Sequence, residues 1–194
     1  MPKIFSNVER ERIVESLQTA ASTALSQYGV KKTTVDDLCS SCHIAKGSFY
    51  LFFESKEDLF LSLIDVFIEK VQKLYLDMLQ NLDENHIVTS LTEVFFSIAK
   101  LFYHDGMFRF FDSENITLIK RKVSTKRLES VKEDEKKAFL ELFSYFSIDN
   151  EEDIKAFIRG YKAILRLYLF NDDILETEKT IKFLIRGLVL QMVE

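Results

Sequence analysis

The chain has 194 residues and a formal net charge of −5, and 47% of its residues are hydrophobic, with one proline and five glycines. This apolar content is enough for a sizeable core without disulfides, and the scarcity of helix breakers favours an all-α protein. No run of about 18 uncharged apolar residues occurs and the N-terminus lacks a secretory core, so we expect a cytoplasmic protein with no membrane partner.

The charge is divided unevenly along the chain. Residues 1–56 contain seven Lys or Arg against six Asp or Glu, whereas residues 57–194 contain 19 against 25. The acidic excess therefore lies in the C-terminal part. A balance of +1 in the first part is small for a nucleic-acid binder and predicts weak non-specific affinity for DNA.

The first expected helix covers residues 7–28 and ends at Gly29, a typical helix terminator. One apolar stripe at helical spacing supports it. The stripe consists of Ile13, Leu17, Ala20, Ala24 and Tyr28.

Residues 33–56 have the pattern of a helix-turn-helix. Thr34 and Asp37 have the spacing of a capping box and begin a short helix. A turn is expected at His43-Ile44, followed by a second short helix over 46–53. Ser55 and Asp58 repeat the capping spacing and begin a third, longer helix at Lys56.

At these residues the sequence resembles the tetracycline-repressor (TetR) family of bacterial transcription regulators. The matching segments are Thr-Thr-Val-Asp-Asp-Leu at 33–38, Lys-Gly-Ser-Phe-Tyr at 46–50 and Phe-Phe-Glu-Ser-Lys-Glu-Asp-Leu at 52–59. The resemblance extends over about Glu9 to Leu63. The chain departs from the family pattern at His43, where Gly is usual in the turn, and at Ala45, where a capping residue is common. His is among the residues that tolerate positive φ, while the missing cap costs about 1 kcal/mol.

The resemblance implies a set of DNA contacts. Phe49 and Phe53 are expected to pack inward. Residues facing the major groove would be Lys46, Gly47, Ser48, Leu51 and Phe52. Residues holding phosphates would be Thr33, Thr34, Tyr50 and Lys56.

The long third helix is expected over 56–82 and would join two domains, 1–55 for DNA binding and 56–194 for ligand binding and dimerisation. A further helix is expected over 89–104, capped by Thr89 or Ser90 and broken at Asp105-Gly106. We expect about nine helices in all, with the long helix as the mechanical link between the domains.

Aromatic residues crowd into positions 95–111. They could form a pocket for an apolar or flat ligand, and the alternative is ordinary core. The expected pocket residues are Phe95, Phe96, Phe102, Tyr103, Phe108, Phe139, Phe143 and Phe146.

The last two helices, expected over 152–170 and 177–193, carry apolar residues on more than one face. A second copy of the chain would bury the extra faces, and the resemblance implies a four-helix dimer interface. The expected interface residues are Ala156, Gly160, Ala163, Leu167, Phe183, Gly187, Leu188 and Leu190.

The sequence contains no nucleophile with its base, phosphate loop or metal cluster, so we expect no catalytic residues, metal or cofactor. Cys39 and Cys42 could be redox-active or half a zinc site, but we expect buried, inert thiols. The predicted function is a dimeric transcriptional repressor released from a near-palindromic DNA operator by a small apolar or aromatic effector. The alternative is a helical interaction or small-molecule-binding protein with a vestigial helix-turn-helix.

Overall fold

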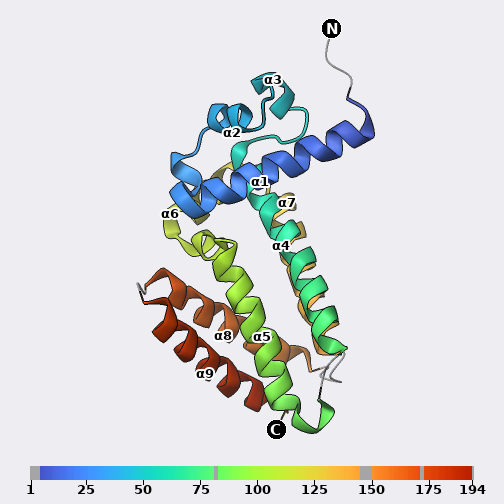
Figure 1. The fold of residues 1–194 in the computed structure, drawn as a ribbon, viewed down its shortest axis with the longest axis vertical. Coiled ribbons are helices and arrows are strands. Elements are labelled where there is room, and N and C mark those ends of the chain that lie inside the picture. Colours follow the sequence, from blue (N-terminus) through green and yellow to red (C-terminus); the bar gives the residue numbers. More distant parts are fainter. Residues whose placement is uncertain (1–4, 81–82, 145–149, 171–172, 194) are drawn as a thin grey trace.

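The computed structural model describes residues 5–80, 83–144, 150–170 and 173–193, and its regular elements are all helical (Figure 1). The predicted all-α class, with an N-terminal helix-turn-helix and a C-terminal helical domain, is confirmed. The described α-helices are α1 (Asn7–Lys32), α2 (Val35–Ser41), α3 (Lys46–Phe49), α4 (Lys56–Leu79), α5 (Ile87–His104), α6 (Ser113–Lys122), α7 (Thr125–Ser144), α8 (Glu151–Leu165) and α9 (Ile174–Val193). Short 3₁₀ helices are η1 (Glu84–His86), η2 (Met107–Phe111) and η3 (Arg166–Leu169).

Helix α1 crosses the upper part of the molecule in Figure 1, below α2 and α3, and packs against α2. The fully buried residues on one face of α1 are Leu17, Ala21 and Leu25. The expected stripe was therefore partly wrong, because Tyr28 is 60% exposed. The regular helix stops at Gly29 as predicted, since this residue has φ +75°, and the chain makes one further turn before Thr33.

Helix α4 runs from the helix-turn-helix to the far end of the molecule (Figure 1). Its 24 residues make it about 36 Å long. Leu59 and Phe60, near its start, are fully buried, and α4 packs against α1, α5, α6 and α7. The helix ends at Leu79, while residues 81–82 of the expected range lie outside the described residues.

The C-terminal domain is built around α5. Phe95 on this helix packs against Phe143, Phe157 and Tyr161, with ring centroids 4.5–5.6 Å apart. The predicted cap at Thr89 or Ser90 was wrong, because α5 begins at Ile87 after the η1 turn. The Ser90 hydroxyl instead donates to the Asp83 carbonyl at 3.2 Å.

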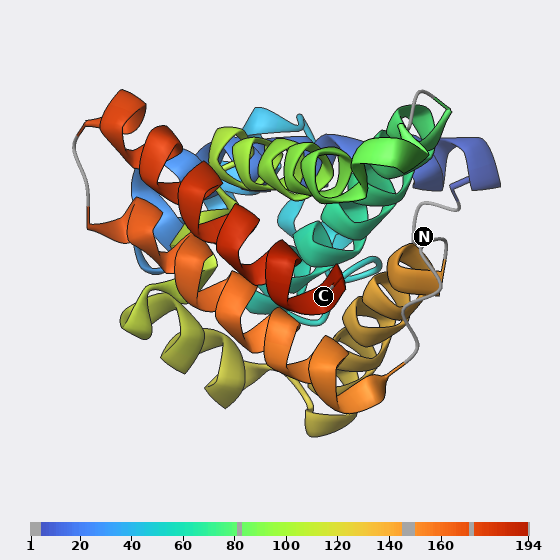
Figure 2. The ribbon, with the colours of Figure 1, turned by 90° about the horizontal axis from the view of Figure 1, so that it is seen from below.

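Gly106 ends α5 at the predicted break and has φ +70°. Helix α8 is shorter than expected, because η3 replaces its last turn. Helices α8 and α9 lie side by side and form an outer layer of the molecule, seen from below in Figure 2.

Candidate nucleic-acid interface and apolar cavity

The first helix of the helix-turn-helix is fixed by the predicted capping box. The amide of Asp37 donates to Thr34 Oγ1 at 3.1 Å, and the amide of Thr34 donates to Asp37 Oδ2 at 3.0 Å. The Thr34 hydroxyl also donates to Asp37 Oδ2 at 2.6 Å, and this hydrogen bond, followed by the one from the Thr34 amide, lowers the pKa of the Asp37 carboxyl. The following turn contains His43 with φ +53°. His43 therefore occupies the left-handed conformation for which glycine is usual.

Helix α3 is shorter than the predicted 46–53 helix. One α-turn, Lys46–Phe49, is followed by tighter turns in which Leu51 N donates to Ser48 O at 3.1 Å and Phe52 N to Phe49 O at 3.0 Å. Ala45 provides no side-chain cap, and Gly47 has low helix propensity. These two features explain why the α-helix does not extend further. Phe49 is fully buried and Phe53 is 8% exposed, so both pack inward as predicted.

Four of the predicted DNA-contacting residues form an exposed surface on and after α3. Lys46 and Gly47 are exposed, Tyr50 is 53% exposed and Leu51 is 49% exposed. Ser48 beside them is half-buried. Surface aromatic and aliphatic side chains beside a lysine can contact base edges and phosphates.

Two polar side chains tie this surface to the rest of the unit. Lys46 Nζ pairs with Asp36 Oδ2 of α2 at 2.9 Å, and both side chains are more than half exposed. Arg10 of α1 lies over the Phe52 ring, 4.9 Å from its centroid, and donates to the Leu51 carbonyl at 3.5 Å. The sequence analysis missed Arg10, because its hydrogen bond to Leu51 joins residues 41 positions apart and no local pattern indicates it.

Three predicted contact residues are engaged within the protein instead. Thr33 is 3% exposed and its hydroxyl donates to the Gly29 carbonyl at 2.9 Å. Lys56 Nζ donates to the carbonyls of Val30 at 2.9 Å and Thr33 at 2.6 Å. Phe52 is half-buried under Arg10. The Thr33 side chain is therefore covered in this structure, whereas Thr34 is exposed.

The two cysteines do not form a metal site with neighbouring residues. Cys39 is 4% exposed, and burial raises the pKa of its thiol. Cys42 is half-buried, which is more exposed than expected. Among the described residues, no group of three His, Cys, Asp or Glu side chains could hold a metal ion.

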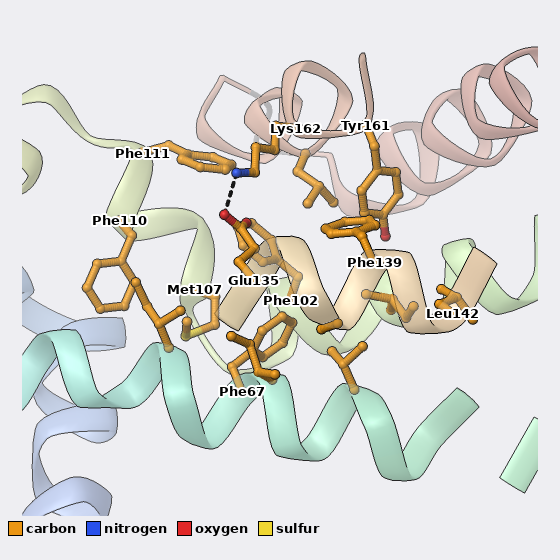
Figure 3. A pocket seen from close by; sticks show the side chains of 16 residues that line it. Phe67, Phe102, Met107, Phe110, Phe111, Glu135, Phe139, Leu142, Tyr161 and Lys162 are labelled. Carbon is orange, nitrogen blue, oxygen red and sulfur yellow. Dashed lines mark hydrogen bonds and ion pairs between the residues drawn. The ribbon is translucent and has the colours of Figure 1, made fainter. Parts of the chain in front are cut away.

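An apolar cavity of about 130 Å³ lies between α4, α5, η2, α7 and α8 (Figure 3). Its walls are formed by the side chains of Ile64, Phe67, Ile68, Val71, Ile98, Phe102, Met107, Phe110, Phe111, Glu135, Ala138, Phe139, Leu142, Tyr161, Lys162 and Leu165. It borders the middle of α4.

Only part of the predicted pocket lines this cavity. Phe102 and Phe139 do so. Phe95 and Phe143 are fully buried core residues, and Phe96 lies beneath the ammonium groups of two lysines instead. Tyr103 and Phe108 stack on each other outside the cavity, with centroids 5.3 Å apart. Phe146 lies outside the described residues.

Two polar features border the cavity. Lys162 Nζ pairs with Glu135 Oε2 at 2.6 Å and joins α8 to α7, as the dashed line in Figure 3 shows. The Tyr161 hydroxyl donates to the Phe95 carbonyl at 2.6 Å, and burial raises the pKa of Tyr161. The rest of the lining is almost wholly apolar, as expected of a dry ligand site.

The predicted dimer residues divide into two groups. Ala156, Ala163, Phe183 and Gly187 are exposed on the outer faces of α8 and α9. The other four are half-buried: Gly160, Leu167, Leu188 and Leu190. The first of these serves packing within the chain, since a Cβ on Gly160 would lie 3.0 Å from the Leu188 side chain.

Similar proteins are found by sequence and by fold. Residues 17–63 match the family described as bacterial regulatory proteins, tetR family. The HTH-type transcriptional regulator YuxN of Bacillus subtilis is 36% identical over 62 residues, covering 32% of this chain and 20% of that protein. The chain thus spans only about a fifth to a third of the length of such curated relatives.

Solved structures match over nearly the whole chain. FadR of Thermus thermophilus, a TetR-family repressor in complex with lauroyl-CoA, has a TM-score of 0.64 at 13% identity, with 93% of this chain and 95% of that chain covered. RolR in complex with resorcinol has a TM-score of 0.57 at 16% identity, with coverage of 97% and 91%. These similarities establish the fold.

No helix in the described part of the chain is long and apolar enough to cross a membrane. The capped α2, the tight turn at His43, the short α3 and the start of α4 lie within the matched segment, and the described helices continue into a C-terminal domain shared with the solved structures. Residues 17–63 are thus similar to the bacterial regulatory proteins of the tetR family, and the chain as a whole has the fold of solved TetR-family regulators.

Proposed function

We propose that the protein is a homodimeric repressor that binds a near-palindromic DNA operator and leaves it when a small apolar or aromatic molecule fills the cavity. The observation that carries the DNA-binding part is the exposed surface of Lys46, Gly47, Tyr50 and Leu51, held on the buried Phe49. A rigid buried anchor beneath exposed side chains is what groove recognition requires.

The cavity supports a small effector. A dry cavity of about 150 Å³ is known to take benzene, and the cavity here, of about 130 Å³, is of that size. Resorcinol, the ligand of RolR, contains a single aromatic ring and is therefore close in size to a ligand that such a cavity holds. A ligand as long as lauroyl-CoA, bound by the Thermus FadR, would require the cavity to open.

The dimer part rests on the outer layer of α8 and α9. Phe183 is 78% exposed there, and the small residues Ala156, Ala163 and Gly187 are also exposed on these two helices. A layer that exposes an aromatic side chain and small residues favours close packing against a second copy. The two domains would be 1–55 and 56–194, with the first turns of α4 packed into the first.

The test is DNA binding by fluorescence anisotropy, with a fragment that the protein selects from a random pool. We expect specific binding that Lys46→Ala weakens more strongly than it weakens binding to unrelated DNA. Benzene or resorcinol should bind and reduce the affinity for the selected fragment. Selection of no sequence at all would overturn the proposal in favour of an interaction protein with a vestigial helix-turn-helix.

A further inference from the structure

The cavity wall formed by η2 is connected to the helix-turn-helix by a buried asparagine. Asn115 of α6 is 5% exposed. Its Nδ2 donates to the Arg109 carbonyl of η2 at 3.0 Å, and its Oδ1 accepts from the Val30 amide at the end of α1 at 3.1 Å. One side chain therefore bonds the segment that carries Phe110 and the helix that supports α2.

The same region is closely packed against α1. A Cβ on Gly29 would lie 3.4 Å from both terminal atoms of Asn115. A Cβ on Gly106, at the start of η2, would lie 2.9 Å from Ser26 Cβ of α1. Both glycines have positive φ. Residues on both sides of η2, Gly106 before it and Asn115 of α6 after it, thus lie close to α1, and close-packed contacts of this kind transmit displacement.

The connection continues into the DNA-binding unit through Val30. Its amide bonds Asn115, and its carbonyl accepts from Lys56 Nζ at 2.9 Å. The same ammonium donates to Thr33 O at 2.6 Å, immediately before the Thr34 cap of α2. A movement of η2 can therefore reach the start of α2 by hydrogen bonds between near neighbours.

We propose that Asn115 is the positioning residue that couples occupancy of the cavity to the orientation of the helix-turn-helix. This route through η2, α6 and α1 is separate from transmission of movement along α4. The inference rests on the proposed function. Asn115 suits the task because its amide donates on the cavity side and accepts on the DNA side, which no carboxylate or aliphatic side chain can do.

An exposed contact crosses the same boundary next to Asn115. Lys31 Nζ pairs with Glu114 Oε2 at 3.2 Å, and both side chains are about two-thirds exposed. Exposed pairs of this kind contribute little. Glu114→Gln is therefore a matched control that removes a contact between the same two elements.

The test is a double-mutant cycle with Ala138→Phe, which places a ring inside the cavity and replaces the unidentified effector. Ala138 is part of the cavity lining. Asn115→Asp retains the acceptor for the Val30 amide and removes the donor to Arg109 O. We expect Ala138→Phe to lower DNA affinity about tenfold or more in the native and Glu114→Gln backgrounds, and less than about threefold with Asn115→Asp, within the range of allosteric coupling.

The outcomes separate the two proposals. An equal loss of affinity in all three backgrounds overturns the coupling by Asn115 and leaves the proposed function standing. No loss of affinity from Ala138→Phe in the native background overturns control by the cavity, and the coupling with it.

A second measurement uses the unaltered chain, in case Asn115→Asp does not fold. Benzene is titrated into the protein and backbone amide resonances are followed by NMR. We expect the Val30 and Asp37 amide signals to shift, while that of Leu17, in the same helix but farther from Asn115, stays in place. Shifts confined to the cavity lining would overturn the inference.

Discussion

The Lys56 ammonium lies 2.6 Å from the carbonyl oxygen of Thr33, so the first residue of α4 is bonded to the segment between α1 and α2. A lysine at a helix N-terminus is opposed by the positive end of the helix dipole. Here the carbonyl oxygens of Val30 and Thr33, which accept hydrogen bonds from the ammonium, offset that cost. Lys56 therefore connects two helix ends within the DNA-binding unit.

Lys56→Ala should lower the free energy of unfolding by about 1–3 kcal/mol, because two part-buried carbonyls lose a charged donor. Lys73→Ala, an exposed lysine on the same helix, is the control and should have almost no effect. Urea unfolding at one fixed protein concentration measures both variants. Equal stability of the two would mean that Lys56 has no such structural function.

Asp36→Asn should raise affinity for DNA, because it frees Lys46 from its ion pair and removes a negative charge near the phosphates. Lys46→Ala should lower affinity and reduce the dependence of log K on log salt by about one for each subunit. Asp77→Asn, which changes the net charge equally on the exposed far part of α4, is the control. An equal gain from Asp36→Asn and Asp77→Asn would show that only net charge matters.

The features that sequence reasoning predicted well depend on a few adjacent residues. The Thr34 cap, the turn at His43 and the break at Gly106 each follow from local chemistry that the chain cannot easily override. The short length of α3 was not predicted. The pattern of the aromatic-rich segment predicts a longer helix, but an uncapped start at Ala45 and the packing of Phe49 determine where the helix ends.

Other features of the site depend on contacts between distant segments, which the local sequence does not show. Thr33 and Lys56 look like phosphate ligands in the motif, yet one is buried and the other bonds the end of α1. Aromatic composition likewise identified the region of the cavity and two of its wall residues, Phe102 and Phe139, but not the others. Phe67 lines it from α4, while Phe95 belongs to the core, and tertiary packing alone separates these cases.

The Asp37 capping box should make stability sensitive to acid. The pKa of Asp37 is lowered in the folded state, so its contribution is fully present above the unfolded pKa of about 3.9 and is lost as pH falls through the lower folded value. We expect the stability difference between the native chain and Asp37→Asn to be constant near neutral pH and to shrink below about pH 4. Thermal unfolding at a series of pH values measures it, and a constant difference down to pH 2 would contradict the prediction.

Gly187→Glu should convert the proposed dimer to monomers without harming the fold of each chain. Nothing lies within 4 Å of a Cβ built at Gly187, and replacing Gly within a helix favours the helix by about 0.5–1 kcal/mol. A loss of dimerisation would therefore result from the new side chain at the contact with the partner, and not from misfolding of the chain. Leu188 is a poorer choice for this experiment, because its side chain packs on Gly160 of the same chain.

Sedimentation velocity of Gly187→Glu should show monomers with unchanged far-UV circular dichroism, and DNA affinity should fall because a near-palindrome requires two half-site contacts about 34–36 Å apart. Tyr28→Glu is the matched control, since Tyr28 is also exposed but lies on α1, and it should remain dimeric. Phe183→Glu should behave like Gly187→Glu, because that ring is 78% exposed on the same helix. If both α9 variants sediment as dimers, then the two copies do not meet through the outer face of α9.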